Sequence, residues 1–272
     1  MTRPISKDTT LCMSLAARPS NFGTRFHNFL YAALDLDYIY KAFTTTDLAA
    51  AIGGVRALGI RGCAISMPFK EACMPLVDEL DASAQAIQSI NTIVNTDGWL
   101  KAYNTDYIAI GQLLRAHRIP PQLSFILCGS GGMARAVAFA LKEAGCTRGV
   151  IVARNEAAGR SLSAQSGFPW RPDLGDTRAD LLINVTPIGM AGGDAAEALP
   201  FSAAAIAAAQ VVFDVVALPP ETPLIRQARA CGKKVIAGAE VFALQAVEQF
   251  ALYTGVRPDR ELFEKAARFA RA

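Results

Sequence analysis

A glycine-rich segment carries the most distinctive chemical pattern in this sequence. It fits G-x-G-x-x-[G/A], follows the apolar segment 124–128 and opens a segment, 131–144, whose apolar residues recur at helical spacing. In that context glycine allows a tight turn from strand to helix and lets the main chain approach a pyrophosphate, which lies at the helix N-terminus. We therefore predict a dinucleotide site. Its residues are Gly129, Ser130, Gly131, Gly132, Met133 and Ala134.

An arginine at the end of the next predicted strand bears on which dinucleotide binds. A site selective for NAD usually has Asp or Glu about 20 residues after the glycines, bonded to the ribose hydroxyls. This sequence instead has Arg154, followed by Asn155, with Arg160 further along in the next predicted helix. A guanidinium can hold a 2′-phosphate through charge-assisted hydrogen bonds. The pattern favours NADP over NAD. The alternative is that Arg154 is a solvated surface residue that binds no ligand.

These residues require a sheet to position them, and hydrophobic periodicity predicts one. Asp97 and Gly98 separate two strands as a hairpin turn would. Elsewhere strands alternate with helices, which indicates βαβ units and an α/β fold. The proline-containing segment 118–122 separates the two halves, and we expect a domain boundary near it. Strands are predicted at 10–14, 38–43, 60–66, 90–95, 99–103, 124–128, 150–154, 181–185, 211–216 and 234–236. Helices are predicted at 23–34, at 47–58 with Thr45 or Thr46 as its cap, at 131–144 and at 156–166.

Composition excludes several classes of function. The 272 residues are 52% hydrophobic and 19% charged, with a formal net charge of +3, which excludes a disordered chain. No Lys/Arg-rich run is present, so we expect no nucleic-acid partner. The six cysteines form no C-x-x-C pair and only two histidines occur, so we expect no metal site.

The segment MTRPISKDTT has no apolar core, so no secretory signal is visible. The longest apolar region, 203–212, is shorter than the ~20 residues that a membrane helix needs. We expect a cytoplasmic protein that binds a small-molecule substrate, has no membrane partner and is a monomer or a homodimer.

Motifs spread over the whole chain resemble those of the shikimate dehydrogenase family, in particular its divergent shikimate dehydrogenase-like branch. They are 66–70 (SMPFK), 90–92 (INT), 103–106 (YNTD), the glycine loop, 184–190 (NVTPIGM), 222–224 (TPL) and Gln245. The resemblance implies an N-terminal α/β substrate domain, a Rossmann-type NADP-binding domain and a cleft between them. We expect domain limits of 1–109 with 238–272, and 110–237. It also implies hydride transfer between 3-dehydroshikimate and shikimate.

The resemblance further implies roles for single residues. Lys70 matches the catalytic lysine and Asp106 its aspartate partner. A lysine ammonium can donate the proton that a ketone oxygen needs as hydride reaches the carbon, and the carboxylate orients it. Positions that bond substrate hydroxyls are matched by Asn91 and Gln245, and a further hydroxyl position by Ser66. Positions beside the nicotinamide are matched by Asn184, Thr186 and Met190.

Departures from the family pattern lie where the substrate carboxylate is held. Two serines of the family's S-x-S-P-x-x-H-N element are replaced by Asn21 and Gly23, which leaves Ser20 and Asn21 as the donors there. Ala64 and Ala217 stand where the family usually has asparagine and tyrosine. Each lost hydrogen bond to a charged group costs roughly 1.5–3 kcal/mol. These changes spare the catalytic pair and alter substrate recognition.

Other functions remain open from the sequence. A close variant would oxidise quinate or aminoshikimate. A non-catalytic regulator could use the same fold to bind a metabolite, although it would not need the ionisable pair Lys70 and Asp106. A third possibility is an NADP enzyme of another substrate class, such as a folate-pathway dehydrogenase. His27 lies among apolar residues at helical spacing, so we expect a structural role for it.

Overall fold

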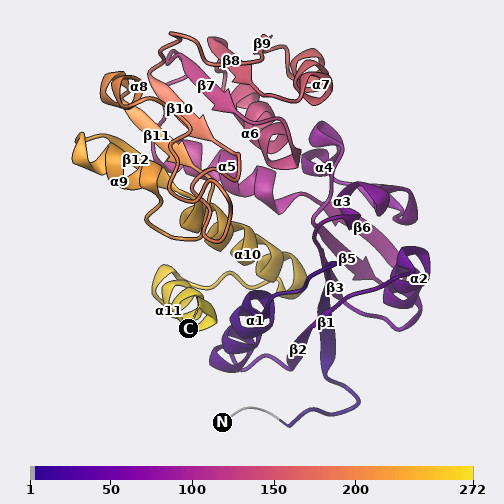
Figure 1. Ribbon diagram of the computed structural model, residues 1–272. Helices are drawn as coiled ribbons and strands as arrows, with labels where there is room; N and C mark the ends of the chain where they lie inside the picture. Colours follow the sequence, from indigo (N-terminus) through magenta and orange to yellow (C-terminus); the bar gives the residue numbers. More distant parts are fainter. Residues whose placement is uncertain (1–3, 272) are drawn as a thin grey trace. The chain divides into compact units, whose positions relative to one another are not determined.

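The computed structural model describes residues 4–271, which form two compact units (Figure 1). The first unit holds the described residues up to Thr105 and those from Ala243 onward, and the second unit is the continuous stretch Asp106–Phe242. The chain passes between them within two helices, α5 (Thr105–Ala116) and α10 (Gly238–Thr254). The predicted α/β class is confirmed. The predicted domain limits stay a prediction, and segment 118–122 lies inside the second unit.

The first unit contains a mixed sheet with the strand order β2-β1-β3-β5-β6-β4. Its strands are β1 (Thr10–Leu15), β2 (Tyr38–Phe43), β3 (Gly62–Ile65), β4 (Glu79–Leu80), β5 (Thr92–Thr96) and β6 (Trp99–Tyr103). Strand β1 is parallel to β2 and β3, whereas β5 and β6 pair antiparallel. Asp97 and Gly98 join them with φ of +52° and +88°, as a tight hairpin turn requires, which confirms the predicted hairpin.

Helices of the first unit enclose an aromatic core. They are α1 (Asn21–Ala33), α2 (Leu48–Ala57), α3 (Phe69–Ala72), the 3-10 turn η1 (Met74–Leu76), α4 (Ala82–Ile87), α11 (Arg260–Arg271) and α10 from Ala243 onward. Helices α1 and α11 lie side by side (Figure 1). Phe26 and Leu30 of α1 share one buried cluster with Phe250 of α10 and Ala266 of α11. The last helices of the chain therefore complete a core that the first helix begins.

The cap of α2 differs from the prediction. Asp47 Oδ1 accepts a hydrogen bond from Ala50 N at 2.9 Å, so Asp47 is the N-cap. Thr45 Oγ1 instead accepts from Asp47 N at 3.0 Å, in the turn before the helix. The assignment of the cap to Thr45 or Thr46 was wrong because a carboxylate both bonds the orphan N–H groups and complements the helix dipole.

The second unit contains a parallel sheet. Its strands are β7 (Phe125–Cys128), β8 (Gly149–Val152), β9 (Trp170–Arg171), β10 (Leu181–Asn184), β11 (Val211–Asp214) and β12 (Lys234–Ala237). Its helices beyond α5 are α6 (Gly132–Glu143), α7 (Glu156–Ser166), α8 (Ala203–Ala208) and α9 (Pro223–Ala230). The strand order is β12-β11-β10-β7-β8-β9, so the direction of strand addition reverses between β7 and β10. This is the order of a Rossmann-type sheet, in which ligands bind outside the carboxyl ends of the strands at that reversal.

Candidate active site

The second unit has a pocket at the point where its strand order reverses. The pocket has a volume of about 770 Å³ and lies at the carboxyl ends of β7, β8 and β10. Six residues predicted for the cofactor line it: Gly129, Ser130, Gly131, Arg154, Asn155 and Thr186. Gly132, Met133 and Ala134 form the first turn of α6 and are not among the lining residues.

The backbone of the glycine loop fits a pyrophosphate. Gly129 has φ of +125°, and a Cβ there would lie 2.7 Å from Val185 Cγ2, so only glycine fits between β7 and β10. A Cβ at Gly131 or Gly132 would meet no other part of the chain within 4 Å, which leaves space for a ligand. Helix α6 begins there without a side-chain cap, so its first N–H groups can bind an anion.

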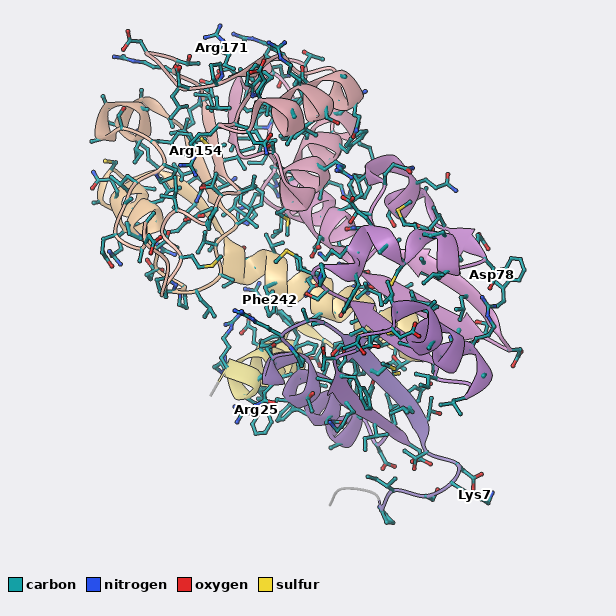
Figure 2. All side chains as sticks on the ribbon, turned by 45° about the vertical axis from the view of Figure 1, so that its right-hand side comes forward. Lys7, Arg25, Asp78, Arg154, Arg171 and Phe242 are labelled. Atoms are coloured by element: carbon teal, nitrogen blue, oxygen red, sulfur yellow. The ribbon has the colours of Figure 1, made fainter. Side chains whose placement is uncertain are left out.

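Of the two arginines predicted for the 2′-phosphate, only Arg154 lines this pocket. Arg154 is exposed just beyond the end of β8 (Figure 2) and has no ion-pair partner among residues 4–271. Arg160 Nε donates to Glu156 Oε1 at 2.7 Å, and its guanidinium lies 4.8 Å from the centre of the Trp170 ring. Asn155 caps α7 by accepting from Ala158 N at 3.0 Å. Arg154 is therefore the positively charged side chain that is available to bind an anionic group in this pocket.

Asn184 anchors the loop after β10 from inside the core. Its Nδ2 donates to Asp214 Oδ1 at 3.0 Å, and its Oδ1 accepts from Thr186 Oγ1 at 2.6 Å. Burial raises the pKa of the Asp214 carboxyl, while a hydrogen bond from Thr222 lowers it less. Asn184 is fully buried, so it shapes the loop, whereas Thr186 faces the pocket. Met190 is 43% exposed and is not among the lining residues.

A buried polar network in the first unit is centred on Asn91. Asn91 Oδ1 accepts from Thr105 N at 2.8 Å and from Thr92 Oγ1 at 2.9 Å. Asn91 Nδ2 donates to Gln245 Oε1 at 3.5 Å, and Thr105 Oγ1 lies 3.4 Å from the same oxygen. Gln249 Nε2 donates to the main-chain oxygen of Asn91 at 3.2 Å and to Thr92 Oγ1 at 3.0 Å. The structure thus brings together two residues predicted for the substrate, Asn91 and Gln245.

The two predicted catalytic residues adjoin this network through the main chain. Lys70 lies in α3, and its main-chain oxygen accepts from Ile90 N at 3.1 Å, one residue before Asn91. Asp106 follows Thr105 directly, in the first turn of α5, and is 8% exposed. Ser66 is exposed after β3, where its N–H donates to Leu15 O at 2.9 Å.

The start of α1 carries the residues predicted for a substrate carboxylate. Asn21 is its first residue, and Ser20 before it makes no side-chain cap. A Cβ at Gly23 would lie 3.3 Å from Tyr40 Cε1 and 3.4 Å from Tyr40 Oη. Tyr40 is 2% exposed, so it has little room to shift. A serine Cβ at this position would therefore press against the buried Tyr40 ring, which would have to shift by a few tenths of an ångström.

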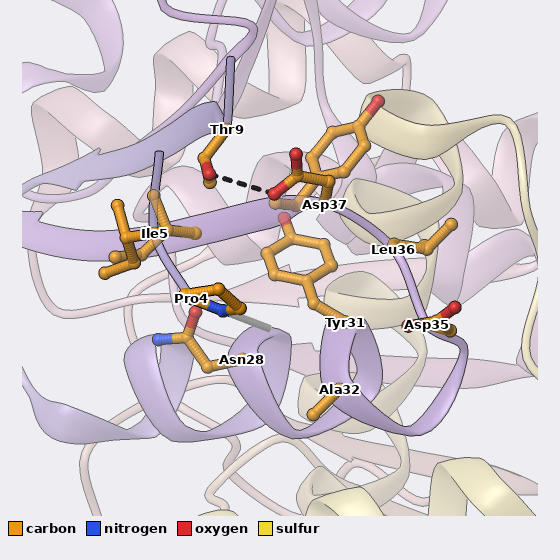
Figure 3. Close-up of a pocket in the computed structure, with 11 residues that line it drawn as sticks. Pro4, Ile5, Thr9, Asn28, Tyr31, Ala32, Asp35, Leu36 and Asp37 are labelled. Atoms are coloured by element: carbon orange, nitrogen blue, oxygen red, sulfur yellow. Dashed lines mark hydrogen bonds between the residues drawn. The ribbon is translucent and has the colours of Figure 1, made fainter. Parts of the chain in front are cut away.

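A second cavity, of about 260 Å³, lies in the first unit among α1, the loop before β2 and the segment before β1 (Figure 3). Thr9 Oγ1 donates to Asp37 Oδ1 at 2.9 Å in its wall, and none of the predicted site residues lines it. Across residues 4–271, no three His, Cys, Asp or Glu side chains gather as a metal site would need. Within the same range, no helix has the length and apolar character to cross a membrane.

Sequence reasoning missed Thr92, Thr105 and Gln249. Thr92 and Thr105 belong to the motifs 90–92 and 103–106, in which only Asn91 and Asp106 match family site residues. Gln249 stands four positions after Gln245 in α10, so both lie on one helix face. That spacing was the available signal, and it became meaningful only once the hydrogen bonds to Asn91 and Thr92 were seen.

Comparison with known proteins places these features in a family. The family model for the shikimate dehydrogenase substrate binding domain matches residues 22–93, and that for the shikimate 5'-dehydrogenase C-terminal domain matches residues 238–268. A shikimate dehydrogenase-like protein of Haemophilus influenzae is 58% identical over 98% of this chain and 98% of its own length.

Two solved structures are similar to this chain over nearly its whole length. One of a shikimate 5-dehydrogenase-like protein has a TM-score of 0.97 and 57% identity, covering 99% of this chain and 100% of that chain. The shikimate 5-dehydrogenase of Thermus thermophilus, in complex with NADP(H) and shikimate, has a TM-score of 0.84 and 31% identity, covering 96% of this chain and 99% of that chain.

Proposed function

This chain belongs to the shikimate dehydrogenase family, and on that premise we propose that it is an NADP-dependent oxidoreductase. Its proposed reaction interconverts 3-dehydroshikimate and shikimate, or a closely related cyclic polyol acid, by hydride transfer. The observation that carries the proposal is the buried network centred on Asn91. This network joins a predicted substrate-binding pair, Asn91 and Gln245, to the main chain beside Lys70 and Asp106.

Lys70 and Asp106 have complementary roles in this proposal. When bound, NADPH would supply the hydride for reduction and NADP+ would accept it during oxidation. Lys70 Nζ donates a proton to the substrate carbonyl oxygen during reduction and takes it back from the hydroxyl during oxidation. Asp106 orients the ammonium group and accepts a hydrogen bond from the same hydroxyl. Asn91 and Gln245 hold the neighbouring hydroxyls, so the reacting carbon stays in one orientation.

The second unit holds the dinucleotide in this proposal. The N–H groups at the start of α6 would bind the pyrophosphate, for which the open space at Gly131 and Gly132 leaves room. Arg154 binds the 2′-phosphate by charge-assisted hydrogen bonds. Thr186, positioned by its bond to Asn184, would hold the nicotinamide end. The Thermus relative, which was solved with NADP(H), supports this choice of cofactor.

The residues at the start of α1 differ from the family pattern where the substrate carboxylate is held. More than one cyclic polyol acid is therefore a candidate substrate. Asn21 and Ser20 offer a carboxylate fewer hydroxyls than the two family serines would, and Tyr40 crowds the position of Gly23. Quinate, with the same carboxylate and a different ring, is therefore tested beside shikimate. A metabolite-binding regulator remains the second candidate, since loss of carboxylate donors weakens substrate binding without touching the fold.

The test is a spectrophotometric assay at 340 nm with shikimate or quinate and either NADP or NAD. We expect oxidation of shikimate with NADP, and a loss of about 10²–10⁴-fold in kcat for Lys70→Met. Lys41→Met removes an exposed lysine of β2 in the same unit and serves as the control, with unchanged kcat. If neither acid is turned over while NADP still binds, the oxidoreductase proposal fails and the regulator takes its place.

A further inference from the structure

The buried network around Asn91 has a fixed hydrogen-bond direction. Main-chain groups cannot exchange donor and acceptor roles, so they identify which end of each carboxamide they meet. Thr105 N–H, 2.8 Å away, requires the oxygen of Asn91 at that end. The main-chain oxygen of Asn91, 3.2 Å from Gln249, requires the nitrogen of Gln249 there. Two of the three carboxamides are thus oriented by the backbone.

The remaining bonds follow from these two. Gln249 Nε2 donates to Thr92 Oγ1, and the Thr92 hydroxyl in turn donates to Asn91 Oδ1 at 2.9 Å, which is nearer than Thr105 Oγ1 at 3.5 Å. With its oxygen occupied, Asn91 presents Nδ2 to Gln245 Oε1. The oxygen of Gln245 therefore faces the network, and its Nε2 faces away, with no acceptor among the described residues. The chain of donors runs from Gln249 through Thr92 and Asn91 to Gln245.

Burial makes this direction costly to reverse. Thr92 and Thr105 are fully buried, Asn91 is 2% exposed and Gln249 is 6% exposed. Turning one carboxamide in such a place would bring two donors or two acceptors together without water to separate them. Gln249 itself lies behind Asn91, on the main-chain side, so it acts through the other residues.

We propose that Gln249 is a positioning residue that, through Thr92, holds Asn91 in the orientation set by Thr105 N–H, so that Asn91 and Gln245 both present N–H groups to the substrate. This inference rests on the proposed function, in which Asn91 and Gln245 hold substrate hydroxyls. A site with only donors at this place selects ligands that offer oxygen lone pairs. It disfavours an analogue with an ammonium group in place of a hydroxyl, because an ammonium has three donors and no acceptor. The preferred class is therefore the hydroxy acid and not its amino counterpart.

The experiment compares two substitutions, Thr92→Val and Gln249→Met. Each removes one hydrogen-bonding group from the chain of donors that runs from Gln249 to Gln245, which we call the relay. We expect each to raise the KM for shikimate by roughly tenfold, with a much smaller change in kcat, because substrate binding is affected before the proton transfer. The preference of the wild type for shikimate over aminoshikimate, measured as a ratio of Kd values by calorimetry, should fall in both. The double variant should cost less than the two single effects multiplied, because both act on one relay. Thr92→Ser keeps the hydroxyl and should have the KM and the Kd ratio of the wild type.

Gln227→Met is the matched control, since Gln227 is a half-buried helical glutamine in the second unit that bonds Cys231 Sγ. Its KM and its preference between the two acids should equal those of the wild type. The inference is overturned if folded Thr92→Val and Gln249→Met both keep the wild-type KM and Kd ratio. Wild-type protein that binds shikimate without turning it over counts against the proposed function alone, because the Kd ratios still test the relay. Wild-type protein that binds neither acid overturns both.

Discussion

At the scale of single residues, burial decides the charge state of His27. The side chain is 1% exposed and stacks on Tyr40 at 4.4 Å between ring centres, and neither ring nitrogen has a hydrogen-bond partner among the described residues. Desolvation lowers its pKa from 6.5 to about 3. The ring is therefore neutral in the fold near neutral pH, which agrees with a structural role.

This burial predicts a specific sensitivity to acid. Because the unfolded chain protonates His27 near pH 6.5 and the folded chain only near pH 3, stability is complete above 6.5 and falls as the pH drops. The loss is about 1.4 kcal/mol per pH unit, or roughly 2 kcal/mol at pH 5. His27→Phe should be at least as stable at pH 7.5, since an apolar ring of similar shape needs no partners, and should lose this part of the pH dependence.

Urea unfolding at pH 7.5 and pH 5.0 measures the effect, with His117→Gln as the control because it removes the other histidine. A variant His27→Phe that loses stability between these pH values as steeply as the wild type would contradict the argument.

At the scale of elements, one carboxylate ties together the starts of three neighbouring strands. Asp180, before β10, accepts from Ser124 N at 2.9 Å and Ser124 Oγ at 2.6 Å, before β7. It also accepts from Gln210 Nε2 at 2.8 Å, before β11. The hydrogen bonds from Ser124 lower the pKa of Asp180. Its contribution to stability is therefore present above the ordinary aspartate pKa and is lost as the pH falls through the lowered value.

Asp180→Asn should destabilise the protein by about 1 kcal/mol at pH 7, a value that allows for partial exposure of the side chain. The difference from the wild type should shrink as the pH falls below 3.8, because the unfolded chain then takes up a proton at Asp180 that the folded chain takes up only at a lower pH. Thermal unfolding from pH 7 to pH 3 tests this, with Asp176→Asn, an exposed residue of the preceding loop, as the control. A difference that is constant over the whole pH range would exclude the proposed charge effect.

Elements whose signals are local could be predicted from the sequence, and those set by distant contacts could not. The turn at Asp97 and Gly98 and the glycine loop depend on backbone conformations that glycine allows within a few residues. Helix α5 was missed, and its start is fixed by the bond of Thr105 N to Asn91, 14 positions earlier. The place of Gln249 in the site depends on bonds to Asn91 and Thr92, which lie 158 and 157 positions away. Hydrophobic periodicity within a short window of the sequence gives no information about either of these contacts.

At the scale of the whole molecule, the second unit is one continuous stretch with its own sheet, buried cluster and pocket. We predict that a fragment of residues 106–242 folds on its own and binds NADP with an affinity within about tenfold of the full chain, because the pocket lining lies inside it. Circular dichroism melting and calorimetric titration with NADP measure this. A fragment that melts without cooperativity would show that the unit depends on the rest of the chain.

The first unit is not continuous, and this affects how the protein is made. Arg61 Nε donates to the main-chain oxygen of Tyr253 at 3.1 Å, and these partners are separated by 192 positions. At a translation rate of about 5–20 residues per second, roughly 10–40 s pass between the synthesis of the two. The apolar face of α1 stays uncovered for at least that long, until α10 and α11 emerge from the ribosome. The speed of translation, and not only the final stability, therefore sets how long this nascent core is open to aggregation or to chaperones.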